Sequence, residues 1–138
     1  MKKLHINPGK NTPEINFSPD ENIFIIRGTS SPEDVRALYY PVIEWFNSFI
    51  NEIMEEGNSI FTSENPLKFQ IDLKYFNSSS AKFLYDIFSE LRRLRNGGIP
   101  FIIEWFFEED DVDLQEAGSD IASIAELEFI FIEKKKRP

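Results

Sequence analysis

The clearest pattern in the chain is a strict alternation followed at once by a helical period. Apolar residues alternate with polar ones at four positions: Leu67, Phe69, Ile71 and Leu73. A period of two is typical of a strand with one buried face. After Asn77–Ser80, apolar residues recur at helical spacing: Phe83, Leu84, Ile87, Phe88, Leu91 and Leu94. The pattern predicts a strand, a polar turn that caps a helix, and a helix that ends before Gly97 and Gly98.

The first half of the chain predicts a hairpin and a long helix. Short apolar runs at Glu14–Phe17 and Ile23–Arg27 are typical of two paired strands. The helix is expected to be capped by a hydroxyl among residues 29–31, with Pro32 at its first position, and to run to a stop near Gly57. Because Pro41 removes an amide donor inside this pattern, we expect a kink or a restart there.

The second half predicts two further strands and a weaker helix. Ile99–Phe107 is almost continuously apolar, which is typical of a central strand covered on both faces. Apolar residues then recur at helical spacing: Leu114, Ala117, Ile121 and Ile124. Gly118 weakens this helix. A last strand is expected over Leu127–Ile132.

The predicted order of elements is ββαβαβαβ. Strands separated by helices imply right-handed crossovers, so the fold class is α/β, with a mostly parallel sheet, an antiparallel N-terminal hairpin and about three helices. With 138 residues the chain is the size of one domain, residues 1–138. Residues 1–22 are expected to form an extended arm and residues 133–138 a frayed basic tail.

Composition and charge exclude several classes of function. The formal net charge of −9 repels phosphate backbones and anionic lipid, so neither nucleic acid nor a membrane is an expected partner. The absence of cysteine excludes thiolate catalysis and cysteine-based metal sites. The first residues do not form a secretory signal, so the expected location is the cytoplasm.

Asn77–Ser80 is the strongest candidate for a functional site. It lies at the carboxyl end of a strand and the amino end of a helix, where free amides and the helix dipole favour an anion. A phosphoryl group on one serine would be held there and would alter a docking surface. The same residues also cap helices for stability alone, and the spacing by itself favours that simpler interpretation. A small-molecule or anion-binding module that uses this helix start is the alternative function.

Other candidates for chemistry are weaker. Asp110, Asp111, Asp113 and Glu116 are hard oxygen donors, and a metal-dependent hydrolase built on them is a third hypothesis, but they lack the calcium-loop pattern. His5, the one histidine, is predicted to lie in the arm, away from the serines. Nucleotide-binding glycine motifs are absent from the sequence. We therefore expect no catalytic residues, no cofactor and no metal ligands.

Four stretches of the chain resemble one protein family. The segment from Ile71 to Lys82 resembles the strand-to-helix signature of the SiaC family of bacterial regulatory phosphoproteins, written N-T-S-S followed by x-K. The segments Thr12–Ile15, Ser31–Trp45 and Trp105–Asp111 also agree, the last together with Glu116 and Gly118. The order of elements is also similar to that of the STAS domains of anti-sigma-factor antagonists. The resemblance spans nearly the whole chain.

The resemblance implies a non-catalytic signalling switch. In that family a partner kinase phosphorylates the threonine of the motif and a PP2C-type phosphatase removes the phosphate. The unphosphorylated form binds and activates a diguanylate cyclase. The threonine corresponds to Ser78, flanked by Asn77, Ser79, Ser80 and Lys82 as expected partner-binding residues. Because serine replaces threonine, the choice among the three serines stays open.

Overall fold

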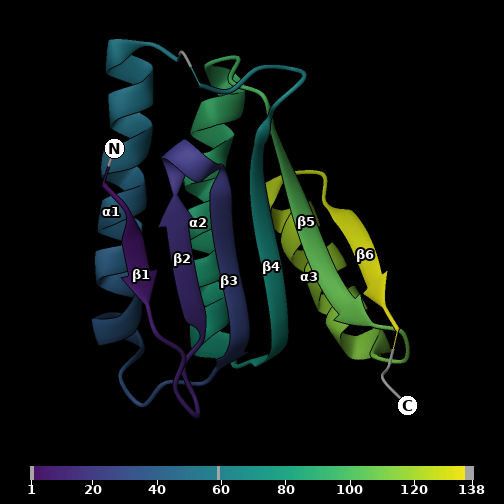
Figure 1. Ribbon diagram of the computed structural model, residues 1–138. Helices are drawn as coiled ribbons and strands as arrows, with labels where there is room; N and C mark the ends of the chain where they lie inside the picture. Colours follow the sequence, from purple (N-terminus) through teal and green to yellow (C-terminus); the bar gives the residue numbers. More distant parts are fainter. Residues whose placement is uncertain (1, 59, 136–138) are drawn as a thin grey trace.

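The computed structural model describes residues 2–58 and 60–135 as one mixed sheet with helices packed against it (Figure 1). The strands are β1 Leu4–Ile6, β2 Glu14–Ser18, β3 Ile23–Ser30, β4 Leu67–Phe76, β5 Phe101–Glu108 and β6 Ile130–Lys134. The helices are α1 Val35–Glu56, α2 Ser78–Asn96 and α3 Val112–Ala125, with a short 3-10 helix, η1, at Pro19–Glu21.

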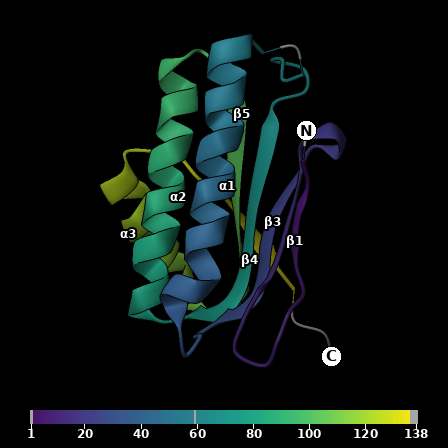
Figure 2. The same ribbon diagram turned by 90° about the vertical axis from the view of Figure 1, so that its left-hand side faces the viewer.

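All three α-helices cover the same face of the sheet. The strands lie side by side in chain order, β1 to β6; β1, β2 and β3 pair antiparallel, and β3 to β6 pair parallel. Each parallel connection leads to the neighbouring strand in the same direction across the sheet. Right-handed crossovers of this kind place every helix on one side, as Figure 2 shows. Within residues 2–58 and 60–135, no α-helix lies on the opposite face of the sheet.

The predicted fold class is confirmed, and the structure adds one strand to it. β1 lies within the predicted arm, where Leu4 pairs with Phe17 and Ile6 pairs with Ile15. The observed order is therefore βββαβαβαβ, with a three-stranded antiparallel start. A strand of three residues is too short for its alternation to be read from sequence, because its stability comes from its pairing with β2.

The predicted tail begins later than expected. β6 continues through Glu133 and Lys134, and the Lys134 ammonium donates to the Asp72 carboxylate on β4 at 2.7 Å. This contact joins two strands that are separated by β5. The last part of the predicted basic tail, residues 136–138, lies outside the described residues.

The start of α1 differs from the prediction. The hydroxyl residues expected to cap it belong partly to β3, which extends to Ser30. The cap is Asp34, whose carboxylate accepts a hydrogen bond from the Ala37 amide at 3.1 Å. The predicted restart at Pro41 is wrong, since one continuous helix runs past it. Pro41 lies in the second turn, so the helix loses a single internal hydrogen bond near its amino end.

The expectation that both faces of β5 are covered is also wrong. Its buried side chains, Ile103, Trp105 and Phe107, alternate with side chains that keep partial contact with solvent. Ile102 and Glu104 belong to this second set, on the face of the sheet that has no helix. A run of apolar residues does not reveal which face is covered when the open face also carries apolar side chains.

Aromatic rings fill the space between the sheet and α1. The Phe17 ring lies 5.3 to 5.9 Å from four others: Phe24, Trp45, Phe46 and Phe69. Tilted pairs at such distances contribute beyond simple burial. These contacts hold β2, β3 and β4 against the helix layer, and so fix the strand from which the candidate site leaves the sheet.

Gly118 in α3 has a packing reason. A methyl group added at this position would lie 2.6 Å from the indole of Trp105, which is fully buried. The absence of a side chain allows α3 to approach β5 closely, and the Trp105 indole donates to the Leu114 carbonyl at 3.2 Å. The glycine that weakens the helix on propensity grounds therefore permits its docking.

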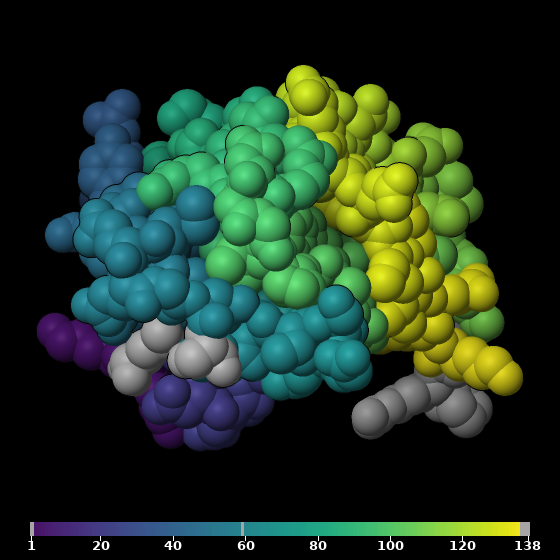
Figure 3. All heavy atoms as spheres, turned by 90° about the horizontal axis from the view of Figure 1, so that it is seen from above, coloured from purple at the N-terminus to yellow at the C-terminus, as the bar shows by residue number. Residues whose placement is uncertain are grey.

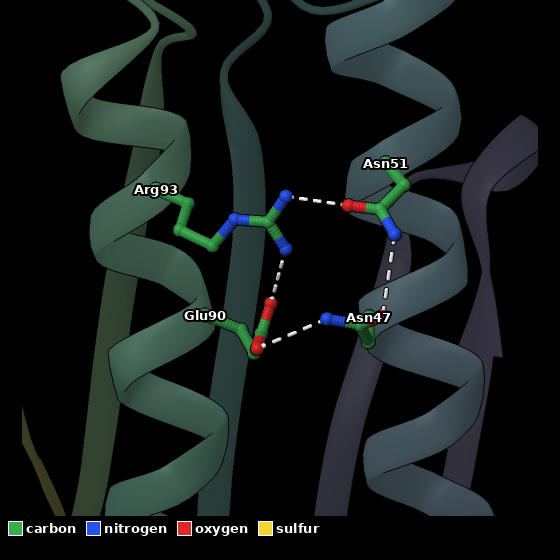
Figure 4. Close-up of polar contacts among 4 residues, drawn as sticks. All are labelled: Asn47, Asn51, Glu90 and Arg93. Atoms are coloured by element: carbon green, nitrogen blue, oxygen red, sulfur yellow. Dashed lines mark hydrogen bonds and ion pairs between the residues drawn. The ribbon is translucent and has the colours of Figure 1, made fainter.

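A closed ring of polar contacts joins α1 to α2 (Figure 4). Asn51 donates to Asn47 at 3.2 Å, and Asn47 donates to the Glu90 carboxylate at 3.2 Å. Arg93 completes the ring by donating to Glu90 at 2.8 Å and to the Asn51 side-chain oxygen at 2.5 Å. Because each member has partners on both sides, the ring fixes the two helices in register.

Candidate functional site

The turn between β4 and α2 is held by Asn77. Its side-chain oxygen accepts a hydrogen bond from the Ser80 backbone amide at 2.8 Å. Its backbone amide donates to the Ser30 carbonyl on β3 at 3.0 Å. Of the four residues predicted to cap the helix, Asn77–Ser80, Asn77 is therefore the N-cap, and it is also tied to the neighbouring strand. These bonds fix where the first turn of α2 lies relative to the carboxyl edge of the sheet.

The three serines that follow Asn77 occupy different environments. Ser78 and Ser79, the first two residues of α2, are exposed. Ser80 is 0% exposed and faces the interior. A kinase needs access to the acceptor hydroxyl, so burial separates Ser80 from the other two. The expectation that Ser80 contacts a partner is corrected, because its side chain does not reach the surface.

Ser80 belongs to a buried chain of hydroxyl groups. Ser30 donates to the Ser80 oxygen at 2.8 Å, and Ser80 donates to the Ser30 carbonyl at 3.0 Å. The Tyr39 oxygen lies 2.6 Å from the Ser30 hydroxyl. Since the single Ser30 hydroxyl hydrogen is used on Ser80, Tyr39 is the donor in this contact. The chain joins α1, β3 and α2 directly beneath the exposed serines.

The environment of Tyr39 keeps its hydroxyl protonated. Burial raises the pKa of Tyr39 above its ordinary value of 10.0 and outweighs the nearby Ser30 and Ser80 hydroxyl groups, which act in the opposite direction. The Tyr39 ring also stacks on Phe83 of α2, with ring centroids 5.6 Å apart and planes within 5°. A neutral donor and a stacked ring make this junction a rigid support for the site.

Lys82 provides the positive charge nearest to the serines along α2. It lies four residues after Ser78 and three after Ser79, so it shares a helix face with both. Its ammonium is 3.7 Å from the Asp86 carboxylate and 4.9 Å from the centre of the Phe83 ring. The side chain is 72% exposed, which leaves it free to turn toward an added negative charge.

The amino end of α2 differs in charge from those of the other two helices. α1 and α3 are capped by Asp34 and Asp111, whereas α2 is capped by a neutral asparagine and has no acidic side chain in its first turn. In any helix the first amides have no intrahelical acceptor, and the dipole there carries about half a positive charge. The arrangement favours an anion on Ser78 or Ser79.

Asp111 and His5 each make structural contacts outside this turn. Asp111 accepts from the Leu114 amide at 3.0 Å, so its carboxylate caps α3. Across residues 2–58 and 60–135, no three acidic, histidine or cysteine side chains are grouped as metal ligands. His5 lies on the edge strand β1, 3.6 Å from the Glu14 carboxylate and three strands away from β4. None of the helices in the described part of the chain is long and apolar enough to cross a membrane.

Sequence reasoning missed two residues of the site, Ser30 and Tyr39. Ser30 was one of three hydroxyl residues, 29–31, expected to cap α1, and Tyr39 lies in an amphipathic helix where an aromatic residue needs no special explanation. The signal that could have revealed Ser30 is that a strand need not end with its apolar run. β3 continues beyond that run through Gly28 and Thr29, where it pairs with the end of β4.

Taken together, the fold and the site define a class of protein. It is an α/β domain with its helices on one face of the sheet and with two exposed serines at the start of a helix whose cap is uncharged, next to the buried hydroxyl groups of Ser30, Tyr39 and Ser80. The chain belongs to the SiaC family, whose model is described as "SiaC family regulatory phosphoprotein" and matches residues 6–134. A relative in Pseudomonas aeruginosa (strain UCBPP-PA14), described only as an uncharacterized protein, is 27% identical over 120 residues, which is 87% of each chain.

Solved structures of SiaC from Pseudomonas aeruginosa are similar to this chain. The apo protein has a TM-score of 0.75 and 26% identity, with 97% of this chain and 99% of that chain covered. A second match comes from the crystal structure of the diguanylate cyclase SiaD in complex with its activator SiaC, with a TM-score of 0.77 and 25% identity. There the alignment covers 96% of this chain and 99% of the other. The family predicted from the sequence is confirmed.

Proposed function

We propose that this chain is a non-catalytic switch that binds and regulates a diguanylate cyclase while Ser78 is unmodified. A cognate kinase and a PP2C-type phosphatase set the state of Ser78. The observation that carries the proposal is the exposed hydroxyl of Ser78 at the first position of α2, two residues before the buried hydroxyl of Ser80. The complex of SiaD with SiaC supports the class of the partner.

The modification is a reversible phosphoryl transfer. The Ser78 hydroxyl attacks the terminal phosphorus of ATP, ADP leaves, and the hydroxyl proton passes to a base of the kinase. The phosphatase reverses the change by hydrolysis, which returns the serine and releases inorganic phosphate. This chain contributes only the acceptor and its position, so it needs no catalytic residue of its own.

The phosphate changes the surface that a partner meets. It adds about −1.5 to −2 charges at neutral pH. Lys82 lies on the same helix face, and its present contact with Asp86 at 3.7 Å is loose enough to be exchanged for the phosphate. A neutral hydroxyl with a nearby cation thus becomes a strongly hydrated anion. A partner fitted to the neutral surface loses contacts and has to desolvate the phosphate.

Ser78 and Ser79 are both exposed, and the family motif favours Ser78 as the acceptor. Phosphopeptide mapping of protein purified from its native cells tests this directly. One phosphoryl group on Ser78 is the expected result. Modification of Ser79 alone would move the acceptor by one residue, and no modification under any growth condition would contradict the switch.

Binding measurements test the consequence of the modification. Calorimetry against the purified diguanylate cyclase of the same organism is expected to give equal affinity for wild type and Ser78→Ala, and at least tenfold weaker binding for Ser78→Glu. Ser79→Glu is the matched control, with the same charge one position along an exposed turn. Equal affinities for Ser78→Ala and Ser78→Glu would rule out this mechanism.

A further inference from the structure

A groove lies at the end of the molecule opposite to Ser78, where α2 and α3 finish and β5 begins. Its volume is about 740 Å³. The apolar residues that line it include Ile99, Phe101, Ile103, Ala122, Leu127 and Ile130. Seen from above, the yellow segment that follows α3 lies beside the green residues at the end of α2 and the start of β5 (Figure 3). Ile130 is 48% exposed at this groove.

One edge of β5 is unpaired along this groove. In the described part of the chain the pairing of β5 with β6 begins only at Glu104 and Ile130. On its other edge β5 pairs with β4 from Phe101 onward. The backbone groups of Phe101 and the amide of Ile103 point away from β4 and precede the pairing with β6, so they lie along the groove without a strand partner in the described part of the chain. Such groups bind readily to another extended backbone.

The rim of the groove is negatively charged. Glu126 and Glu128 are exposed lining residues, and the carbonyl ends of α2 and α3 add partial negative charge. Arg95 is the basic residue among those that line the groove, and its guanidinium donates to the Glu126 backbone carbonyl at 2.5 Å. The balance of charge favours an occupant that carries a lysine or arginine.

We propose that this groove binds an extended peptide segment of a partner protein by strand addition to Phe101–Ile103. The segment presents apolar side chains to Phe101 and Ile130, which keep exposed surface in the groove, and a basic side chain to Glu126 and Glu128. An unpaired strand edge requires alternating donors and acceptors, which a peptide backbone supplies and a small apolar molecule does not. This binding site is separate from Ser78 and does not depend on the proposed phosphorylation.

Selection of binders to this protein from a phage library of random 12-residue peptides tests the proposal. Phages that also bind the Ser123→Trp variant are removed in a counter-selection step. Ser123 is exposed on α3 and lines the groove, so tryptophan there fills it. Ser119→Trp is the matched control, one turn earlier and outside the lining. We expect peptides with alternating apolar residues and at least one basic residue. Their calorimetric affinity should fall at least tenfold in Ser123→Trp and stay within twofold in Ser119→Trp.

Two further measurements make the result specific. Bound peptide should slow hydrogen exchange of amides within Phe101–Ile103, as strand addition requires. Glu128→Lys should weaken binding of a basic peptide at least threefold at low salt, and this substitution of an exposed residue does not depend on the bulky tryptophan being tolerated.

Several outcomes would overturn the proposal. Failure to enrich any groove-dependent peptide would do so, as would bound peptides that leave exchange at Phe101–Ile103 unchanged. If a hydrophobic dye such as anilinonaphthalene sulfonate binds in the groove and no peptide does, the site is one for small molecules. If ultracentrifugation shows a dimer that Ser123→Trp abolishes, the occupant is a second copy of this chain.

Discussion

Replacement of Ser80 by alanine separates a structural serine from its two exposed neighbours. The substitution removes one hydroxyl from the chain that runs from Tyr39 through Ser30 to Ser80. The Ser30 carbonyl keeps its bond from the Asn77 amide, so no backbone acceptor is left without a donor. The Asn77 cap also remains, because it binds the Ser80 amide and not the Ser80 side chain.

The expected loss of stability follows from the number of hydroxyl hydrogens and acceptors. In Ser80→Ala the Ser30 hydroxyl has no Ser80 oxygen to donate to, and only its contact with the Tyr39 hydroxyl remains. One hydrogen bond between these two hydroxyl groups uses one of their two hydrogens, so the other hydrogen has no acceptor. Ser30 is 0% exposed, so water does not replace the lost partner. An unsatisfied buried group costs about 1–3 kcal/mol. For 138 residues the entropy of unfolding is about 0.3 kcal/mol per kelvin, so the melting temperature should fall by about 3–10 °C.

Urea unfolding followed by circular dichroism measures this loss, with Ser79→Ala as the matched control. Ser79 is exposed in the same helical turn, so its alanine variant should stay within about 0.5 kcal/mol of wild type. A double variant, Ser80→Ala with Tyr39→Phe, should lose less than the sum of the two single losses, because both act on one chain. If Ser80→Ala and Ser79→Ala are equally stable, the hydroxyl chain contributes nothing measurable and the reasoning is refuted.

Three further predictions concern packing, pH and the ring between α1 and α2. Gly118→Ala should cost about 1–3 kcal/mol because the new methyl group overlaps the Trp105 indole, and an unchanged tryptophan emission spectrum would contradict this overlap. Burial raises the pKa of Tyr39, so its contribution to stability is complete below its unfolded pKa of 10.0 and is lost as pH rises through the folded pKa. Tyr39→Phe should therefore lose less stability than wild type above pH 10, as measured by urea midpoints; parallel curves would count against the shift. Asn51→Ala removes an acceptor of the Arg93 guanidinium and should cost about 1 kcal/mol by the same urea assay, while no change would show that the ring adds nothing.

Local patterns were sufficient for the central part of the fold. The alternation in β4, a polar cap within Asn77–Ser80 and the period of α2 are each specified within a few residues, and the structure confirms all three. The start of α1 was misplaced because the hydroxyl residues 29–31 are good caps by local rules. Ser30 belongs instead to β3, where it pairs with Phe76, which is 46 residues away in the chain. Such long-range pairing outweighs local preference.

The exposure of each serine also depends on distant residues. Ser78, Ser79 and Ser80 are identical in type and adjacent in sequence, yet only the last turns inward to meet Ser30 and Tyr39. Helical geometry separates consecutive residues by about 100° around the axis, but the sequence does not state where the interior lies. Tertiary contacts were therefore needed to exclude Ser80 as an acceptor.

The neutral cap of α2 has a consequence for the lifetime of the protein in the cell. A phosphate at the first position of a helix whose cap carries no charge favours the folded state by about 0.3–1 kcal/mol. Under the proposed switch, the form that has lost its partner is thus at least as resistant to unfolding as the active form. Because degradation follows the population of unfolded chains, the cell would keep its inactive molecules as a reserve that a phosphatase returns to use without new synthesis.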